Sequence, residues 1–85
     1  MYQEDLVTTE LIDVKFLNTE KTYGYLNDPS LGIRLKDFVI VPAGNDFTVG
    51  VVVAGTNNKI EGINYKKVAY RIDLEKFKKS YNGTT

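Results

Sequence analysis

The stretch VIVPAGNDFTVGVVVAG, residues 39–55, decides the fold of this 85-residue chain. Two runs rich in β-branched residues flank the turn-forming segment 43–46, so the stretch predicts two antiparallel strands joined by a short connection. Pro42 ends the first strand, because proline cannot donate a hydrogen bond to a central ladder. Gly50 lies inside the second strand, where it permits a sharp bend or the close approach of another backbone. We therefore expect a central hairpin in a strongly curled or closed sheet.

Residues 47–54 carry apolar side chains on both sides of the predicted strand. The odd positions form one apolar face, and the even positions form a smaller face that is only partly apolar. One of the two faces is expected to be core. Apolar side chains on both faces favour a small curled or closed sheet.

Other segments of the chain also have the composition of strands. Ile12, Val14 and Phe16 alternate with charged residues, as in a half-buried strand. Residues 27–35 are rich in turn formers and predict a surface loop. Strands are predicted over residues 11–17, 22–26, 38–42, 47–54 and 68–72.

A short helix is predicted at the C-terminal end. Asp73 is a good N-cap, and Leu74, Phe77 and Tyr81 share one face at helical spacing. The chain is therefore predicted to be one mostly β domain: a small five-stranded antiparallel barrel or curled sheet with a short C-terminal helix. Its parts are an acidic leader that is either flexible or ordered (1–10), the β-barrel (11–72), the helix (73–81) and a tail (82–85).

The composition argues against catalysis. The chain contains neither cysteine nor histidine, which excludes disulfides and removes common zinc ligands and the commonest general base. No pair of carboxylates has a spacing that suits acid–base chemistry. We expect a protein that is not an enzyme and uses no metal or cofactor. Since there is no basic-then-apolar leader and no apolar run of membrane length, we also expect a soluble, cytoplasmic protein.

The charges balance overall but are unevenly distributed. Lysine and arginine number 11, as do aspartate and glutamate, so the formal net charge is zero. Residues 1–13 are acidic, whereas residues 66–79 are mainly basic. Either the two ends pair or remain solvated, or the basic end faces an anionic partner.

Four short motifs are similar to those of a known family in order and spacing. They are YGYL at 23–26, KDFVIVPAG at 36–44, VGVVV at 49–53 and KKVAYRID at 66–73. Together they cover about residues 12–73 and resemble the N-terminal 3′-DNA-end-binding domain of the primosomal replication-restart helicases. The resemblance implies a free-standing β-barrel-like module that holds the terminal nucleotide of a DNA strand.

The resemblance also implies which residues bind. Tyr23 and Tyr25 fall on the family's aromatic pair, Gly44 on its turn glycine and Lys66 on its lysine. Gly24 departs from the pattern, because it stands where the family has a carboxylate that accepts a hydrogen bond from the terminal hydroxyl. A tyrosine face can stack on a base, and a lysine can neutralise a phosphate. The candidate nucleic-acid contacts are Tyr23, Gly24, Tyr25, Gly44, Lys66, Lys67 and Arg71.

The candidate residues also have structural interpretations. Tyr23 and Tyr25 could pack in the core or against a cross-strand neighbour. Lys66 and Lys67 could be a solvated strand edge, and Gly44 could serve backbone geometry alone.

Two functions follow from these readings. The first is weak binding of single-stranded DNA or a DNA end in replication or repair. The second is a protein-interaction module or inhibitor, encoded by a phage or mobile element, that binds a host protein through an exposed strand edge or the acidic N-terminal segment. A monomer and a homodimer both remain open.

Overall fold

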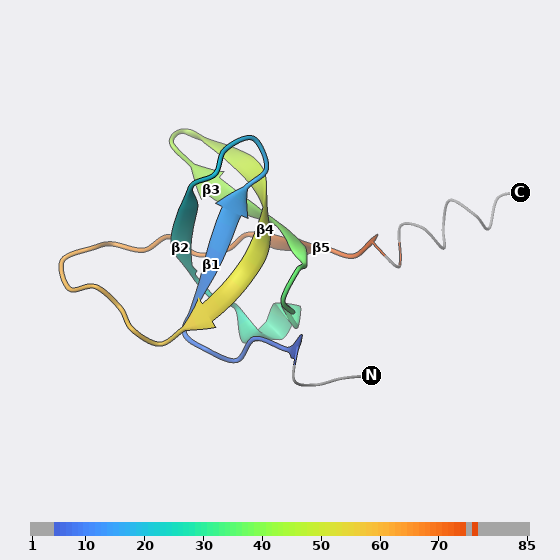
Figure 1. Cartoon of the computed structure of the whole chain (residues 1–85), viewed down its shortest axis with the longest axis horizontal. Coiled ribbons are helices and arrows are strands. Elements are labelled where there is room, and N and C mark those ends of the chain that lie inside the picture. Colours follow the sequence, from blue (N-terminus) through green and yellow to red (C-terminus); the bar gives the residue numbers. More distant parts are fainter. Residues whose placement is uncertain (1–4, 75, 77–85) are drawn as a thin grey trace, which may run out of the picture.

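The computed structural model describes residues 5–74 and 76, and it contains one five-stranded antiparallel sheet (Figure 1). The strand order is β2-β1-β4-β3-β5. The strands are β1 (Leu11–Phe16), β2 (Thr22–Leu26), β3 (Phe38–Ala43), β4 (Asp46–Thr56) and β5 (Tyr70–Ile72), and a 3-10 turn, η2 (Pro29–Leu31), follows β2. The prediction of a mostly β, five-stranded antiparallel sheet is confirmed. The named strands do not close into a barrel.

The central hairpin forms, but its connection is shorter than predicted: Pro42 does not end β3, which continues to Ala43, and β4 already begins at Asp46. The last pair of β3 and β4 is Ala43 opposite Asp46, which leaves Gly44 and Asn45 as the turn. Gly44 has a φ of 61°, a conformation that glycine adopts without the steric cost of a Cβ. The hairpin therefore owes its register to a glycine at the first of two turn positions.

The core lies on the inner side of the curled sheet. Ile12 and Val14 of β1 are completely buried, as the alternation in this strand predicts. Val39 and Val41 of β3 join them, together with Val52 of β4. Each such side chain contributes about 1.5–3 kcal/mol by leaving water.

The smaller face of β4 is the core face. Gly50 and Val52 are buried, whereas Phe47 on the odd-numbered face is 62% exposed. A Cβ on Gly50 would collide with the Val14 side chain and lie 2.9 Å from the Lys15 backbone oxygen. Because β1 and β4 approach so closely here, β4 has no room for a side chain at position 50.

β5 is shorter than predicted. It begins at Tyr70 and not at Val68, because the backbone of Val68 turns toward the other edge of the sheet. Val68 N donates to Leu26 O (3.1 Å), and Leu26 N donates to Lys66 O (2.8 Å). One residue further on, Ala69 N donates to Ile40 O of β3 (2.9 Å).

The segment 66–69 thus bridges β2 and β3. We call the gap between β2 and β3 the seam: segment 66–69 fills it beside Leu26 and Ile40. Beyond that point, residues 22–24 of β2 face residues 42–43 of β3 without an intervening strand. The seam is closed at one end and open at the other.

Residues 5–10 pack against the body of the protein. Val7 is 8% exposed and belongs to the core cluster, and its N–H donates to Ile33 O (2.8 Å). Leu35 N donates to Asp5 O (2.9 Å). This part of the acidic leader is therefore ordered.

The predicted C-terminal helix lies mainly outside the described residues. Of residues 73–81 only Asp73, Leu74 and Lys76 are described, and the tail 82–85 is not. Asp73 Oδ1 accepts a hydrogen bond from Lys76 N (3.0 Å), as an N-cap does. The helix beyond this turn stays a prediction. Within residues 5–74 and 76, no helix has the length and apolarity needed to cross a membrane.

Candidate functional site

Five of the seven candidate residues line one cavity. Tyr23, Gly24, Tyr25, Gly44 and Lys66 surround a space of about 640 Å³ at the open end of the seam. This volume is within the usual range of small-ligand sites, roughly 300–1,000 Å³. We call it the seam cavity.

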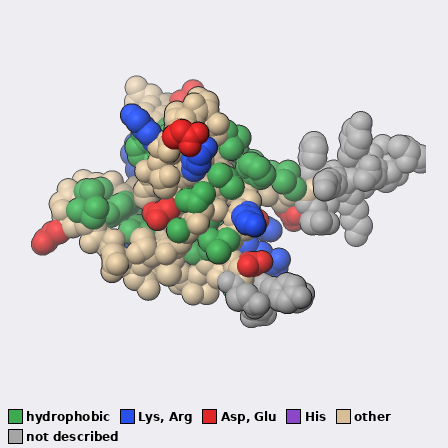
Figure 2. All heavy atoms as spheres, in the orientation of Figure 1, with side chains coloured by type: hydrophobic (Ala, Val, Ile, Leu, Met, Phe, Trp, Pro, Cys, Tyr) green, Lys and Arg blue, Asp and Glu red, His purple; other side chains and the backbone are tan. Residues whose placement is uncertain are grey.

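One wall of the seam cavity is the loop between β4 and β5. This loop projects from the sheet beside β2, as the orange segment in Figure 1 shows. Its base is held by Glu10, whose N–H donates to Asn57 Oδ1 (2.7 Å) and whose carboxylate pairs with Lys59 (2.8 Å). Ile60 and Ile63 further along it are 62% and 50% exposed and line the cavity. Figure 2 shows hydrophobic side chains gathered on this projection.

The two candidate tyrosines have different environments. Tyr25 is 6% exposed and belongs to the core cluster, and its hydroxyl donates to Pro42 O across the seam (2.8 Å). Tyr23 is 43% exposed, and its ring centroid lies 4.7 Å from that of Phe16 in a tilted arrangement. Tyr25 is thus a structural residue that forms the floor of the cavity. Tyr23 lines the cavity and remains partly exposed to it.

Burial also changes the acidity of Tyr25. Desolvation raises the pKa of its hydroxyl above the ordinary tyrosine value, and the nearby Tyr23 hydroxyl adds to the rise. The proton that bonds to Pro42 O is therefore held more firmly than in water.

Gly24 lies under an aromatic ring and beside a carboxylate. A Cβ on Gly24 would be 3.2 Å from Tyr65 Cε1 and 3.9 Å from Asp13 Oδ1. Asp13 is the cross-strand partner of Gly24, and both Asp13 and Tyr65 line the seam cavity. The Tyr65 ring is fixed because its hydroxyl accepts a hydrogen bond from Ile60 N (2.9 Å). The carboxylate in the cavity therefore comes from β1, whereas the resemblance predicts one at position 24 of β2.

Gly44 and Lys66 stand on opposite sides of the seam. Gly44 is exposed in the hairpin turn, and no atom lies within 4 Å of the position that its Cβ would take. Lys66 is exposed, and its backbone carbonyl bonds to Leu26 at the closed end of the seam. Among the described residues its ammonium group has no acidic partner within 4 Å. It is therefore the cation that the cavity can offer to an anion.

Lys67 lies outside the seam cavity. Its ammonium group is 3.6 Å from Asp28 Oδ2, on the other side of segment 66–69. Hydrogen bonds from the Ser30 side chain and backbone lower the pKa of Asp28, and Lys67 contributes to the lowering. The lysine side chain is still 59% exposed.

Arg71 is also directed elsewhere. Its Nε lies 2.7 Å from Asp37 Oδ2, and both side chains are largely buried. The same carboxylate oxygen accepts a hydrogen bond from Arg34 N (2.8 Å). Arg71 therefore ties β5 to the turn that precedes β3.

Sequence reasoning missed Asp13 and Tyr65. The signal for Asp13 was the register of the β1–β2 hairpin, which places it opposite Gly24. Tyr65 sits in an irregular loop, so no periodicity could place it over Gly24. In the described part of the chain, no group of three acidic side chains is arranged to hold a metal ion.

Comparisons with family models, with curated proteins and with solved structures found no match to this chain.

Proposed function

We propose that the protein binds the end of single-stranded DNA in the seam cavity. The observation that carries the proposal is the convergence of Tyr23, Gly24, Gly44 and Lys66 on one cavity, although they come from β2, the β3–β4 turn and the segment before β5. These positions were selected from the sequence for their resemblance to a DNA-end-binding domain. Their clustering supports that reading.

The cavity offers one group for each part of a nucleotide. The exposed surface of Tyr23 can stack on a base, which is worth about 1–3 kcal/mol per base in single-strand binding. Lys66 can neutralise a phosphate. Asp13 and Gly24 point to the opposite face of the sheet from Tyr23, so Asp13 can accept a hydrogen bond from a sugar hydroxyl that passes the edge of β2.

The electrostatics favour weak binding. The chain is formally neutral, and Lys66 is the cavity's single cation among the described residues. One phosphate contact on a single strand gives a slope of about −0.7 in log affinity against log salt. Raising the salt from about 50 to about 200 mM should therefore weaken binding only about threefold.

Fluorescence anisotropy with a labelled oligonucleotide that has a free 3′ hydroxyl tests the proposal. Tyr23→Ala should weaken binding at least about fivefold, because it removes the stacking surface. Lys66→Ala should weaken binding and flatten the salt dependence. Lys67→Ala is the matched control, since it removes the same charge one residue away and outside the cavity; it should change little.

The proposal fails if low-salt anisotropy detects no binding at protein concentrations of tens of micromolar. It also fails if Lys66→Ala and Lys67→Ala weaken binding equally, because the charge of the surface and not the cavity would then be responsible.

A second candidate function is protein binding. In this case a phage or mobile element would encode the protein, and its partner would be a protein of the host cell. One observation favours it: β2 is an edge strand whose far side, over residues 22–24, no described strand covers. Uncovered edges are common sites of association through an added strand.

A further inference from the structure

We infer that the open end of the seam receives an extended segment of a partner polypeptide, which adds to β2 as a strand. This inference rests on the second of the two proposed functions, protein binding. It specifies the mode of binding, the edge used and the character of the segment.

The direction of the backbone groups in β2 carries the argument. Leu26 uses its N–H and C=O on the side away from β1, where they bond to Val68 and Lys66. Backbone groups two residues apart point to the same side of a strand, so those of Gly24 and Thr22 also point away from β1. No hydrogen bond from the described part of the chain reaches them.

At Pro42 the opposite side of the seam offers no free donor. Pro42 of β3 has no N–H, and its carbonyl accepts the Tyr25 hydroxyl (2.8 Å). The two sides therefore differ: Thr22 and Gly24 present two donors and two acceptors, and Pro42 presents none that is free. An added strand would pair with β2 and merely lie beside β3.

The added strand would continue a pairing that the chain itself begins. Lys67 bridges Leu26 in the parallel sense, and the seam cavity extends from that point along residues 22–25. Tyr65 leaves room above Gly24 for only a small side chain, since a Cβ there would already be 3.2 Å from its ring.

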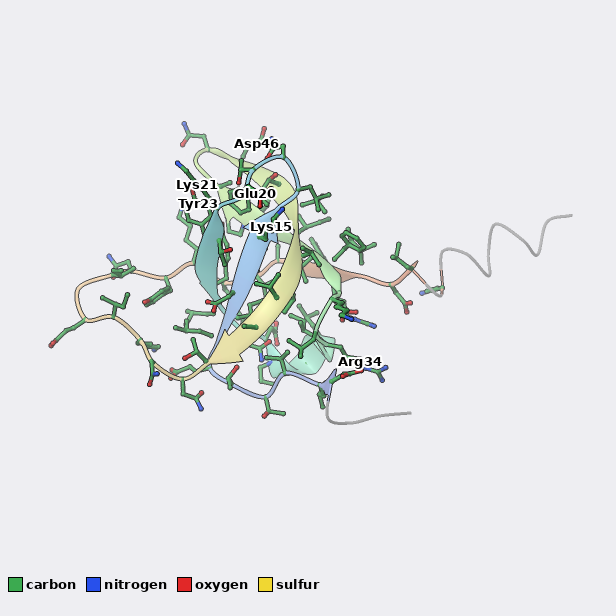
Figure 3. The ribbon with its side chains drawn as sticks, viewed as in Figure 1. Lys15, Glu20, Lys21, Tyr23, Arg34 and Asp46 are labelled. Carbon is green, nitrogen blue, oxygen red and sulfur yellow. The ribbon has the colours of Figure 1, made fainter. Side chains whose placement is uncertain are left out.

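The surroundings define the partner segment. Phe16, Tyr23 and Tyr25 line the inner side of the cavity, so the residue that points inward should be apolar. Lys66 lines the groove at one end. At the other end Figure 3 shows Lys21 and Glu20 near Tyr23, so opposite charges lie together there. The charge of Lys66 favours an extended segment with an apolar centre and an acidic residue at the Lys66 end.

Selection of a random dodecapeptide phage library on the full chain, followed by amide NMR, tests the inference. Each enriched peptide is made in two N-methylated forms. One form is methylated at the N–H groups that face β2, and the other at the N–H groups that face away from it. The first form should bind about tenfold more weakly, whereas the second should bind like the parent peptide. The parent peptide should shift the amide signals of Thr22 and Gly24 and slow their hydrogen exchange.

Variants of the chain provide a second measurement. Thr22→Pro removes an N–H that points away from β1, a substitution that edge strands tolerate, and it should abolish peptide binding. Thr22→Val keeps the N–H and should retain it.

Several outcomes would overturn the inference. The first is that no peptide is enriched, and the second is that both methylated forms bind equally. The third is that the peptide shifts only amide signals outside the seam. The fourth is that a second copy of the chain, and not the peptide, protects Thr22 and Gly24. If oligonucleotides bind and peptides do not, this inference falls and the DNA proposal stands. A host protein that binds Thr22→Pro as well as the wild type would preserve the protein-binding function and exclude strand addition.

Discussion

The hydroxyl of Tyr25 donates a 2.8 Å hydrogen bond to the carbonyl of Pro42, and this bond joins β2 to β3 across the open seam. Tyr25→Phe removes the bond and leaves the rest of the ring in the core. Because a typical hydrogen bond contributes about 0.5–1.5 kcal/mol, we expect the free energy of unfolding to fall by about 1 kcal/mol in urea denaturation. An unchanged midpoint would mean that the bond does not hold the seam.

The same tyrosine should make stability depend on pH at alkaline values. Its pKa is raised in the folded state, so the folded protein holds this proton more firmly than the unfolded chain does. The stabilisation is fully present below the unfolded pKa of about 10 and is lost as the pH rises through the folded pKa. Urea denaturation between about pH 8 and about pH 11 should show a steeper loss for the wild type than for Tyr25→Phe. Parallel pH profiles would contradict the assignment.

Gly50 should tolerate no side chain. In Gly50→Ala the new methyl group meets Val14 and the Lys15 backbone, and overpacking of this kind lowers the free energy of unfolding by about 1–3 kcal/mol. Val53→Ala, on the exposed outer face of the same strand, is the control and should change it by less than about 0.5 kcal/mol. Thermal or urea denaturation measures both. Equal stability of Gly50→Ala and the wild type would show that β1 and β4 are not in close contact.

Arg71 should matter for stability and not for DNA binding. Its bond to Asp37 is charge-assisted and largely buried, so Arg71→Gln and Asp37→Asn should each lower the free energy of unfolding by about 1.5 kcal/mol or more. In a double-mutant cycle the two effects should be strongly non-additive. If Arg71→Gln lost DNA affinity without a change in stability, Arg71 would have to be counted among the DNA-binding residues.

The elements that local sequence determines were predictable. The β3–β4 hairpin follows from β-branched runs around a glycine turn, and the buried side of β1 follows from its alternation. The start of β5 could not be predicted, because Val68 N donates to Leu26 O, a contact between residues far apart in the chain. Which face of β4 is core depends on the approach of β1 at Gly50, which is also a non-local fact.

Some residues of the candidate site could also be predicted from the sequence, whereas others depend on tertiary contacts. Tyr23 and Gly24 could be placed on one strand, and the resemblance supplied Gly44 and Lys66. The acidic partners of Lys67 and Arg71, by contrast, are set by tertiary contacts with Asp28 and Asp37. Asp13 enters the cavity through strand register and Tyr65 through an irregular loop, so neither position follows from composition or spacing.

We propose that the seam cavity binds the end of a DNA strand. Titration of the ¹⁵N-labelled full chain with a short single-stranded oligothymidylate tests it most directly. The account predicts that amide signals of Tyr23, Gly24, Tyr65 and Lys66 shift together, and that a 3′-phosphorylated oligonucleotide shifts them less. Shifts centred on Lys67 and Arg71, or no shifts at millimolar oligonucleotide, would contradict it.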